Sequence, residues 1–327
     1  MKNSMFPRIH TLVFGLCFSG LSAQVSTFNQ YNAQLGHINP AFISNVDKDN
    51  ASLVTRRQWK NDRLGSWISE ASGNKFLPRI NSSIGLFAHY GFNLKGSYTA
   101  NAYGLQFAYR ILFLERVYLC AGFGAWYSAS ETDVNNYHYL YEPKKDHTIN
   151  PEERITSSAW TGSFGFVVHD PVKWHYLGFS LRNRQLYANV PSSGKKVTRE
   201  PGFSIQGLYR LDITRNSLVF STFIYERTGA LAYSMGDTSR TVLERRQHYF
   251  FLQENLLFAK YFIIGIGYKA FAGNYGMLNW RFTLITGRNK RLSLGYSFDT
   301  RRYIRNDKIR YNSSHELSLR YKLPSKQ

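Results

Sequence analysis

From about residue 51 onward, large apolar residues alternate with small or polar ones along the chain. In Tyr103–Ile111 the odd positions hold Tyr, Leu, Phe, Tyr and Ile, while the even ones hold Gly, Gln, Ala and Arg. The same alternation recurs in residues 203–211, 262–269, 278–284, 292–299 and 316–323. Successive side chains of a β-strand point to opposite faces, so each segment has one apolar and one polar face. The pattern predicts an all-β chain.

The alternation and the turn residues between segments predict about fourteen strands. Twelve remains an open alternative, because the alternation is least regular in the first three segments. The expected strands are residues 51–59, 66–77, 79–90, 97–113, 116–130, 155–168, 174–187, 202–212, 217–227, 244–258, 261–271, 276–287, 290–299 and 313–323.

The lengths of the connections divide by parity. Connections after even-numbered strands are short, whereas the long ones, 131–154, 188–201, 228–243 and 300–312, all follow odd-numbered strands. Bacterial outer-membrane barrels have short periplasmic turns, longer extracellular loops and an even number of strands. A soluble β-sandwich has no reason to divide its loops in this way. We therefore predict a transmembrane antiparallel β-barrel over residues 51–323, followed by a C-terminal tail at 324–327.

Basic residues lie in mid-strand on the small-residue face, which suits a watery lumen better than a solvated sandwich exterior. Two interpretations stay open. The lumen is an anion-attracting pore, or it is plugged and the basic residues pair with Glu254, Asp299 and Glu316. The candidate lumen-lining residues are Arg110, Arg182, Arg184, Arg210, Lys269, Arg281 and Arg320.

The first 23 residues have the features of a secretory signal peptide. Lys2 and Arg8 form a basic start, residues 12–21 are apolar, and Leu21-Ser22-Ala23 is a small-residue cleavage site. The apolar run is about half of what a membrane-spanning helix needs. Cleavage would leave Cys120 as the one thiol, which excludes an intrachain disulfide.

Residues 24–50 differ in kind from the strands. They are polar, contain Asn39-Pro40-Ala41 and show no sustained alternation. We expect them to form an N-terminal segment in the periplasm or within the mouth of the barrel.

Composition agrees with an exported barrel. Aromatic residues make up 16% of the chain, and a membrane barrel uses them on its lipid-facing strands and at both interfaces. The formal net charge is +20, of which the signal peptide contributes Lys2 and Arg8. In an exported protein this excess favours outer-membrane lipid headgroups and lipopolysaccharide over nucleic acid. We therefore predict that the chain lies in the outer membrane of a Gram-negative bacterium.

No catalytic, metal-binding or cofactor-binding motif stands out, so we do not expect an enzyme. The Gly-x-Gly runs at 122–124 and 265–267 have no helix after them to hold a phosphate, and they suit lumen-facing positions where space is needed. The histidines and glutamates of the longest loop match no ligand spacing. His169-Asp170 lies in an expected periplasmic turn, without a serine placed to act with it.

Three stretches of the chain together resemble a known family. They are Asn39-Pro40-Ala41-Phe42, preceded by Gln30-Tyr31-Asn32; Arg56-Arg57-Gln58-Trp59; and residues 292–299 followed by 314–321. Their order and spacing resemble the PorP/SprF membrane proteins of the type IX secretion system. Two features depart from that pattern: Lys60–Gly65 lacks a Gly-x-Pro-x-Thr run, and Ser314 stands where a glycine is expected.

The resemblance implies an outer-membrane component of a machine that exports, and in some cases anchors, large proteins such as gliding adhesins. The implied partners are periplasmic and lipoprotein subunits of that machine and the C-terminal domains of its cargo. Asn39, Pro40 and Ala41 at the periplasmic entrance are then candidates for a partner contact, and the alternative is a proline-fixed entry into the first strand. About fourteen strands are too few for folded cargo to pass, which favours a supporting role. A general or anion-preferring porin is the alternative function.

Overall fold

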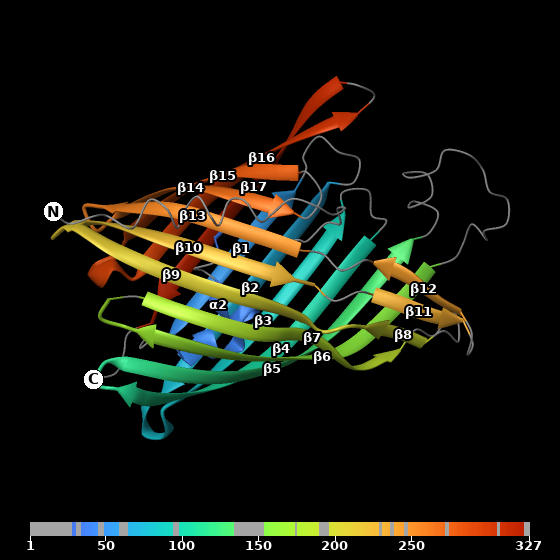
Figure 1. Ribbon diagram of the computed structural model, residues 1–327, viewed down its shortest axis with the longest axis horizontal. Coiled ribbons are helices and arrows are strands. Elements are labelled where there is room, and N and C mark those ends of the chain that lie inside the picture. Colours follow the sequence, from blue (N-terminus) through green and yellow to red (C-terminus); the bar gives the residue numbers. More distant parts are fainter. Residues whose placement is uncertain are drawn as a thin grey trace, which may run out of the picture.

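The computed structural model shows a closed barrel of fourteen antiparallel strands (Figure 1). The structure describes residues 28–30, 34–44, 49–58, 65–93, 98–133, 154–173, 175–189, 196–228, 231–235, 239–244, 248–271, 275–305 and 308–323. The predicted signal peptide, most of the longest loop with His138, His147, Glu152 and Glu153, and residues 324–327 lie outside these ranges.

Each barrel strand pairs with its neighbour along the chain, and the first pairs with the last to close the sheet. The prediction of a transmembrane barrel is confirmed, and the count is fourteen rather than twelve. The barrel strands are β1 (Asn50–Gln58), β2 (Ser66–Leu77), β3 (Ser82–Asn93), β4 (Tyr98–Leu114), β5 (Val117–Asp133), β6 (Arg154–Asp170), β7 (His175–Asn189), β9 (Gly202–Thr214), β10 (Ser217–Arg227), β13 (His248–Phe258), β14 (Phe262–Phe271), β15 (Tyr275–Thr286), β16 (Leu292–Arg305) and β17 (Lys308–Lys322).

The two faces of the sheet follow the alternation in the sequence. On β4, Leu105 and Phe107 point outward, while Gln106 and Ala108, which alternate with them, are buried in the interior. Closing the sheet leaves no unpaired strand edge, which a bilayer demands because unsatisfied backbone groups in lipid cost several kcal/mol each. No helix in the described part of the chain is long and apolar enough to cross a membrane.

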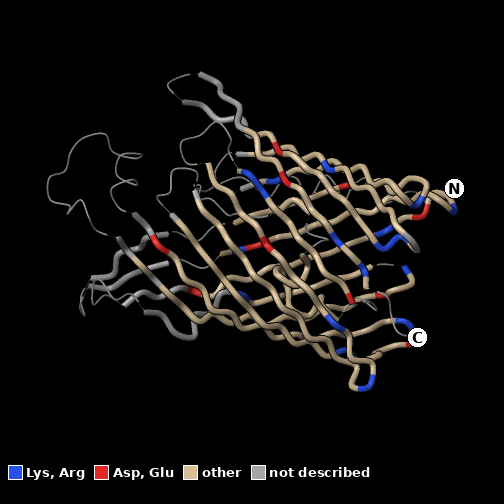
Figure 2. Tube along the Cα trace, turned by 180° about the vertical axis from the view of Figure 1, so that it is seen from behind, with Lys and Arg blue, Asp and Glu red and all other residues tan. Residues whose placement is uncertain are grey.

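The turns at one end of the barrel are all short, at most five residues, and two of them contain single 3-10 turns, η3 (Pro78–Ile80) and η4 (Arg288–Lys290). Basic residues are frequent at this end, where β17 also ends (Figure 2). By the loop-length rule for outer-membrane barrels, this is the periplasmic end.

At the opposite end the structure corrects three expectations. Parts of 188–201 and 228–243 form a three-stranded sheet of β8 (Lys196–Arg199), β11 (Leu231–Met235) and β12 (Ser239–Glu244), which extends beyond the barrel (Figure 1). Most of 300–312 extends β16 and β17 as a projecting hairpin. These strands stand outside the bilayer, so no lipid face imposes alternation on them, and the sequence pattern did not reveal them.

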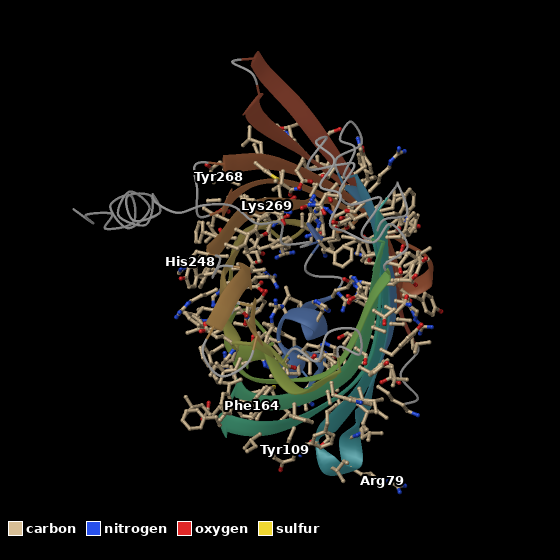
Figure 3. All side chains as sticks on the ribbon, turned by 90° about the vertical axis from the view of Figure 1, so that its right-hand side faces the viewer. Arg79, Tyr109, Phe164, His248, Tyr268 and Lys269 are labelled. Carbon is tan, nitrogen blue, oxygen red and sulfur yellow. The ribbon has the colours of Figure 1, made fainter. Side chains whose placement is uncertain are left out.

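The N-terminal segment lies inside the barrel. It contains the helical turn α2 (Leu35–Ile38) and the 3-10 turn η2 (Pro40–Ser44), and Figure 3 shows its blue ribbon encircled by strands. Asn39 joins the two turns, because its side-chain oxygen accepts a hydrogen bond from the Ala41 N–H at 3.0 Å. Of the two placements that the sequence left open, the described residues take the one within the barrel. We call residues 28–30 and 34–44 the lumen segment.

Candidate functional site

The lumen segment begins on the seam where the barrel closes. The backbone N–H groups of Asn29 and Gln30 both donate to the carboxylate of Glu316 on β17, at 2.6 and 2.7 Å. The Asn29 side-chain amide donates to Asp299 on β16 at 2.6 Å, and its oxygen accepts a hydrogen bond from Arg56 on β1 at 2.8 Å. The segment is thereby tied to both the first strand and the last two.

Buried charges surround Asn29. Arg56 forms ion pairs with Asp299 at 2.6 Å and with Glu316 at 3.3 Å, while Lys269 on β14 pairs with Asp299 at 3.5 Å and also bonds to Asn29. All these side chains are almost fully buried. An unpaired charge at such a site is very costly, so each of these ions depends on the others. We call Asn29, Gln30, Arg56, Lys269, Asp299 and Glu316 the ionic seat.

Strand register explains how the ionic seat forms. Arg56 lies directly opposite Glu316 across the β1–β17 seam, and both face the lumen. Asp299 occupies the next lumen-facing position along β16 after Ser297, which is itself opposite Glu316. Residues at the two ends of the chain therefore meet because the sheet closes in this register.

The second attachment of the segment is uncharged. The Asn39 amide donates to the carbonyl oxygens of Phe166 and Phe179 at 3.0 and 3.1 Å, and to Gln206 Oε1 at 3.1 Å. One side chain thus contacts β6, β7 and β9. A neighbouring contact adds Ser180, whose hydroxyl donates to the Ile38 carbonyl at 2.8 Å.

Glycines make room for this attachment. A Cβ on Gly165 would lie 2.0 Å from Asn39 Oδ1, and a Cβ on Gly122 would lie 2.3 Å from the backbone nitrogen of Ala41. At Gly178 it would lie 3.1 Å from Asn39 Nδ2. Only glycine at these lumen-facing positions lets the segment approach the barrel wall so closely. We call Asn39, Ala41, Phe42, Gly122, Gly165 and Gly178 the glycine seat.

Apolar packing completes the glycine seat. Ala41 and Phe42 form a buried cluster with Cys120 of β5 and Val167 of β6. The Phe42 ring also meets Tyr176 of β7 edge to face, with 4.7 Å between ring centroids. The thiol of Cys120 is fully buried in this cluster, so it serves as a small apolar side chain.

Between the two seats, the helical turn contacts β2, β3 and β4. His37 Nδ1 lies 3.1 Å from Glu70 Oε2, and His89 Nδ1 lies 3.4 Å from the same oxygen. Gln106 Nε2 donates to the Gly36 carbonyl at 2.7 Å. The segment therefore reaches around much of the inner wall.

The predicted lumen-lining basic residues do not form one pore lining. Lys269 belongs to the ionic seat, and the buried Arg281 donates to Thr283 at 3.3 Å. Arg182 pairs with Glu226 and also donates to the His37 carbonyl at 3.4 Å. Arg320 is half-buried. These residues lie inside the barrel, where Lys269 and Arg182 contact the lumen segment.

The other two basic residues lie near the periplasmic turns. Arg110 stacks over the rings of Phe76 and Tyr118, at 4.4 and 4.7 Å from the centroids. Arg210 pairs with Asp212 on its own strand at 2.6 Å. The side chain of Arg184 lies outside the description.

The expected partners of these cations are partly right. Asp299 and Glu316 pair with basic residues in the lumen, whereas Glu254 lies on the outer face of β13. Period-two counting from Tyr249 and Phe251, which are buried, places residue 254 on the opposite face. Among the described residues, no group of three His, Cys, Asp or Glu side chains is placed to hold a metal.

Asn39 and Ala41 are fully buried in the lumen, and Pro40 between them is buried as well. A partner cannot reach them unless the segment leaves its seat. The predicted contact surface at the periplasmic entrance is therefore not formed in this conformation, because these residues face the barrel wall. The sequence feature that indicates their neighbours is the set of glycines at lumen-facing strand positions.

A family model for the type IX secretion system membrane protein PorP/SprF matches residues 21–321, nearly the whole chain. The chain belongs to the PorP/SprF family. Together with the barrel fold, membership places the protein in the outer membrane, as the sequence predicted. A search of curated proteins finds no match to this PorP/SprF chain.

Solved outer-membrane barrels share the fold of this PorP/SprF protein at low identity. The CymD monoaromatic hydrocarbon channel superposes with a TM-score of 0.57 at 12% identity, covering 93% of this chain and 96% of its own. A Pseudomonas aeruginosa FadL homologue gives 0.53 at 10% identity, covering 87% and 92%. The toluene transporter TodX of P. putida gives 0.52 at 9% identity, covering 88% and 93%. These likenesses concern the fold alone.

Proposed function

We propose that this PorP/SprF barrel is a sealed accessory component of the type IX machinery, one that supports export or surface anchoring of cargo proteins without conducting them. The observation that carries the proposal is the lumen segment, which is seated on the inner wall at both of its ends. The proposal rests on family membership for the machine and on the seats for the sealed state.

The energy of the seats supports a segment that stays in place. Phe28, Ile38, Phe42 and Ile43 are all buried. At about 1.5–3 kcal/mol for each large apolar side chain, the burial of these four contributes roughly 6 to 12 kcal/mol. That range overlaps the whole stability of a typical domain. Removing the segment would also leave the buried charges of the ionic seat without some of their partners.

Partners in this proposal bind the outside of the sealed barrel. They are periplasmic and lipoprotein subunits of the secretion system, and the C-terminal domains of exported cargo. The extracellular sheet of β8, β11 and β12 and the projecting β16–β17 hairpin are candidate surfaces on the outer side. The proposal assigns no catalytic step to the protein.

A general or anion-preferring porin is the competing function. It needs a continuous aqueous path lined by free basic residues. Lys269 and Arg182 are instead paired with carboxylates and touch the lumen segment. This arrangement favours the sealed component.

Deleting the gene in its own host separates the two functions. We expect a type IX cargo protein to disappear from the cell surface, while the uptake rate of small anions stays unchanged. Complementation with the full-length chain should restore the cargo. The variant Asp212→Asn, which changes only an exposed ion pair, should restore it equally well. Normal cargo display together with reduced anion uptake would refute the proposal and support the porin.

A further inference from the structure

A carboxylate lies on the lipid-facing side of the barrel. On β13 the odd residues Tyr249, Phe251 and Gln253 point into the lumen and are buried, so Glu254 points outward between Leu252 and Leu256. Its neighbour across the sheet on β14 is Ile266. On β10 the Ser221 hydroxyl donates to Glu254 Oε2 at 2.5 Å, and this is its one hydrogen bond among the described residues.

The depth of Glu254 follows from the aromatic residues below it. Phe258 on the same face, together with Tyr261 and Phe262 at the adjoining turn, is exposed at the periplasmic end. Such a cluster is typical of the aromatic girdle at a membrane interface. Glu254 stands four residues above Phe258. On a strand tilted by about 40°, that is roughly 10 Å into the apolar band.

A carboxylate at this depth is costly to leave with a single hydroxyl partner. Ionisable side chains within the bilayer almost always face other protein groups. The other Lys, Arg, Asp or Glu side chain on β13 and β14 is Lys269, and it points to the lumen. On the lipid face of the barrel, Glu254 Oε1 therefore has no hydrogen-bond donor within the part of the chain that the structure describes.

A second, independent feature adjoins Glu254. The outer surface across β13–β17 and β1 forms an apolar groove of about 970 Å³, although the outer face of a barrel is ordinarily convex. Its lining includes Leu53, Leu256, Ile264, Phe282, Leu294 and Leu317. Leu256 is the next lipid-facing residue after Glu254, so the carboxylate stands at the rim of the groove.

We propose that this groove and Glu254 form a docking face for a membrane-spanning segment of a second outer-membrane protein, which offers Glu254 a hydrogen-bond donor or a cation. Apolar side chains of the partner fill the groove, and the polar group meets the carboxylate. Acyl chains are apolar like the groove, but they have no hydrogen-bond donor, so they cannot satisfy the Glu254 carboxylate. The proposal does not depend on which machine the barrel serves.

Site-specific photo-crosslinking in native outer membranes tests the docking face. A benzophenone amino acid replaces Ile264 in the groove, and a control replaces the equally lipid-facing Leu105 on β4, away from the groove. We expect an adduct with one integral outer-membrane protein from position 264 and none from position 105. Mass spectrometry should map the adduct to a membrane-spanning segment that carries a donor side chain.

The substitution Glu254→Leu tests whether the carboxylate itself contributes to docking. We expect the adduct yield to fall by roughly five- to tenfold, the ratio for a hydrogen bond lost within a bilayer. The purified barrel itself should unfold at a higher temperature, because a charged group leaves the apolar band. The neighbouring change Leu252→Ile should alter neither quantity.

Three results would overturn the proposal. They are adducts with lipid or lipopolysaccharide alone, an adduct with a second copy of this chain, and a protein adduct whose yield Glu254→Leu leaves unchanged. The thermal measurement on the purified variant shows that the barrel is folded, so a lost adduct cannot be attributed to misfolding.

Discussion

The two seats hold the same segment by different physics. At the ionic seat, Asn29 and Gln30 bind charged side chains that are themselves buried and paired. At the glycine seat, Asn39 and Ala41 lie close to the barrel wall at Gly165 and Gly122, which have no side chains. One seat depends on charge balance and the other on shape.

The difference shows what each part of the barrel contributes. The ionic seat spans the closing strands β1, β14, β16 and β17, so it couples the lumen segment to barrel closure. The glycine seat lies on β5, β6 and β7, which are consecutive strands away from the closing seam. It therefore fixes only the position of the segment. Damage to the ionic seat should therefore cost more than damage to the glycine seat.

Glu316→Gln should have the largest effect. Glu316 accepts both backbone N–H groups of the segment and pairs with Arg56. Neutralising one partner of a buried ion pair costs about 3–5 kcal/mol. We expect the free energy of unfolding in lipid vesicles, measured with urea, to fall by that amount. A fall below about 1 kcal/mol, the level of an exposed pair, would contradict the assigned burial.

Gly122→Ala should have the next largest effect. Its methyl group would lie 2.3 Å from the Ala41 backbone, which cannot rotate away. Overpacking of this kind costs roughly 1–3 kcal/mol in the same measurement. The matched control is Gly73→Ala on β2, where the added atom would lie 3.6 Å from its nearest neighbour. Equal losses in the two variants would rule out the close approach at Gly122.

Asn39→Ala removes the polar part of the glycine seat. We expect a loss of about 1–2 kcal/mol, because its hydrogen-bond partners at Phe166 and Phe179 are backbone carbonyls within the sheet. Combined with Glu316→Gln, the losses should add to within about 0.5 kcal/mol, since the two residues share no partner. A larger coupling energy would show that the seats act as one unit.

Arg210→Gln should have the smallest effect. The arginine pairs with Asp212, whose side chain is mostly exposed, on the same strand near a periplasmic turn. Exposed pairs contribute about 0–1 kcal/mol, so the free energy of unfolding should change little. A large loss would mean that the basic residues of the lumen face act together after all.

The barrel itself was predictable because lipid imposes a local rule. Each strand must turn one face to acyl chains, and that alternation is visible within a single segment such as residues 103–111. The parity of loop lengths then oriented the barrel. Outside the bilayer this rule does not apply, so the sequence pattern predicts loops where β8, β11 and β12 form.

The seats were not predictable in the same way. Asn29 and Glu316 are 287 positions apart, and their contact exists only because the sheet closes in one register. Asn39 looked like a surface residue because nothing in its local sequence reveals a wall of glycines. The sequence predicts that Gly122 leaves space in the lumen. It does not predict that the backbone of Ala41 fills this space.

The central claim is that the lumen segment seals the barrel, and ionic conductance across planar bilayers tests it most directly. The full-length protein should give no steady current above that of the bare bilayer, whereas Glu316→Gln should show intermittent channel openings as the segment leaves its seat. Steady open-channel currents from the unmodified protein, unaltered by Glu316→Gln, would contradict the account.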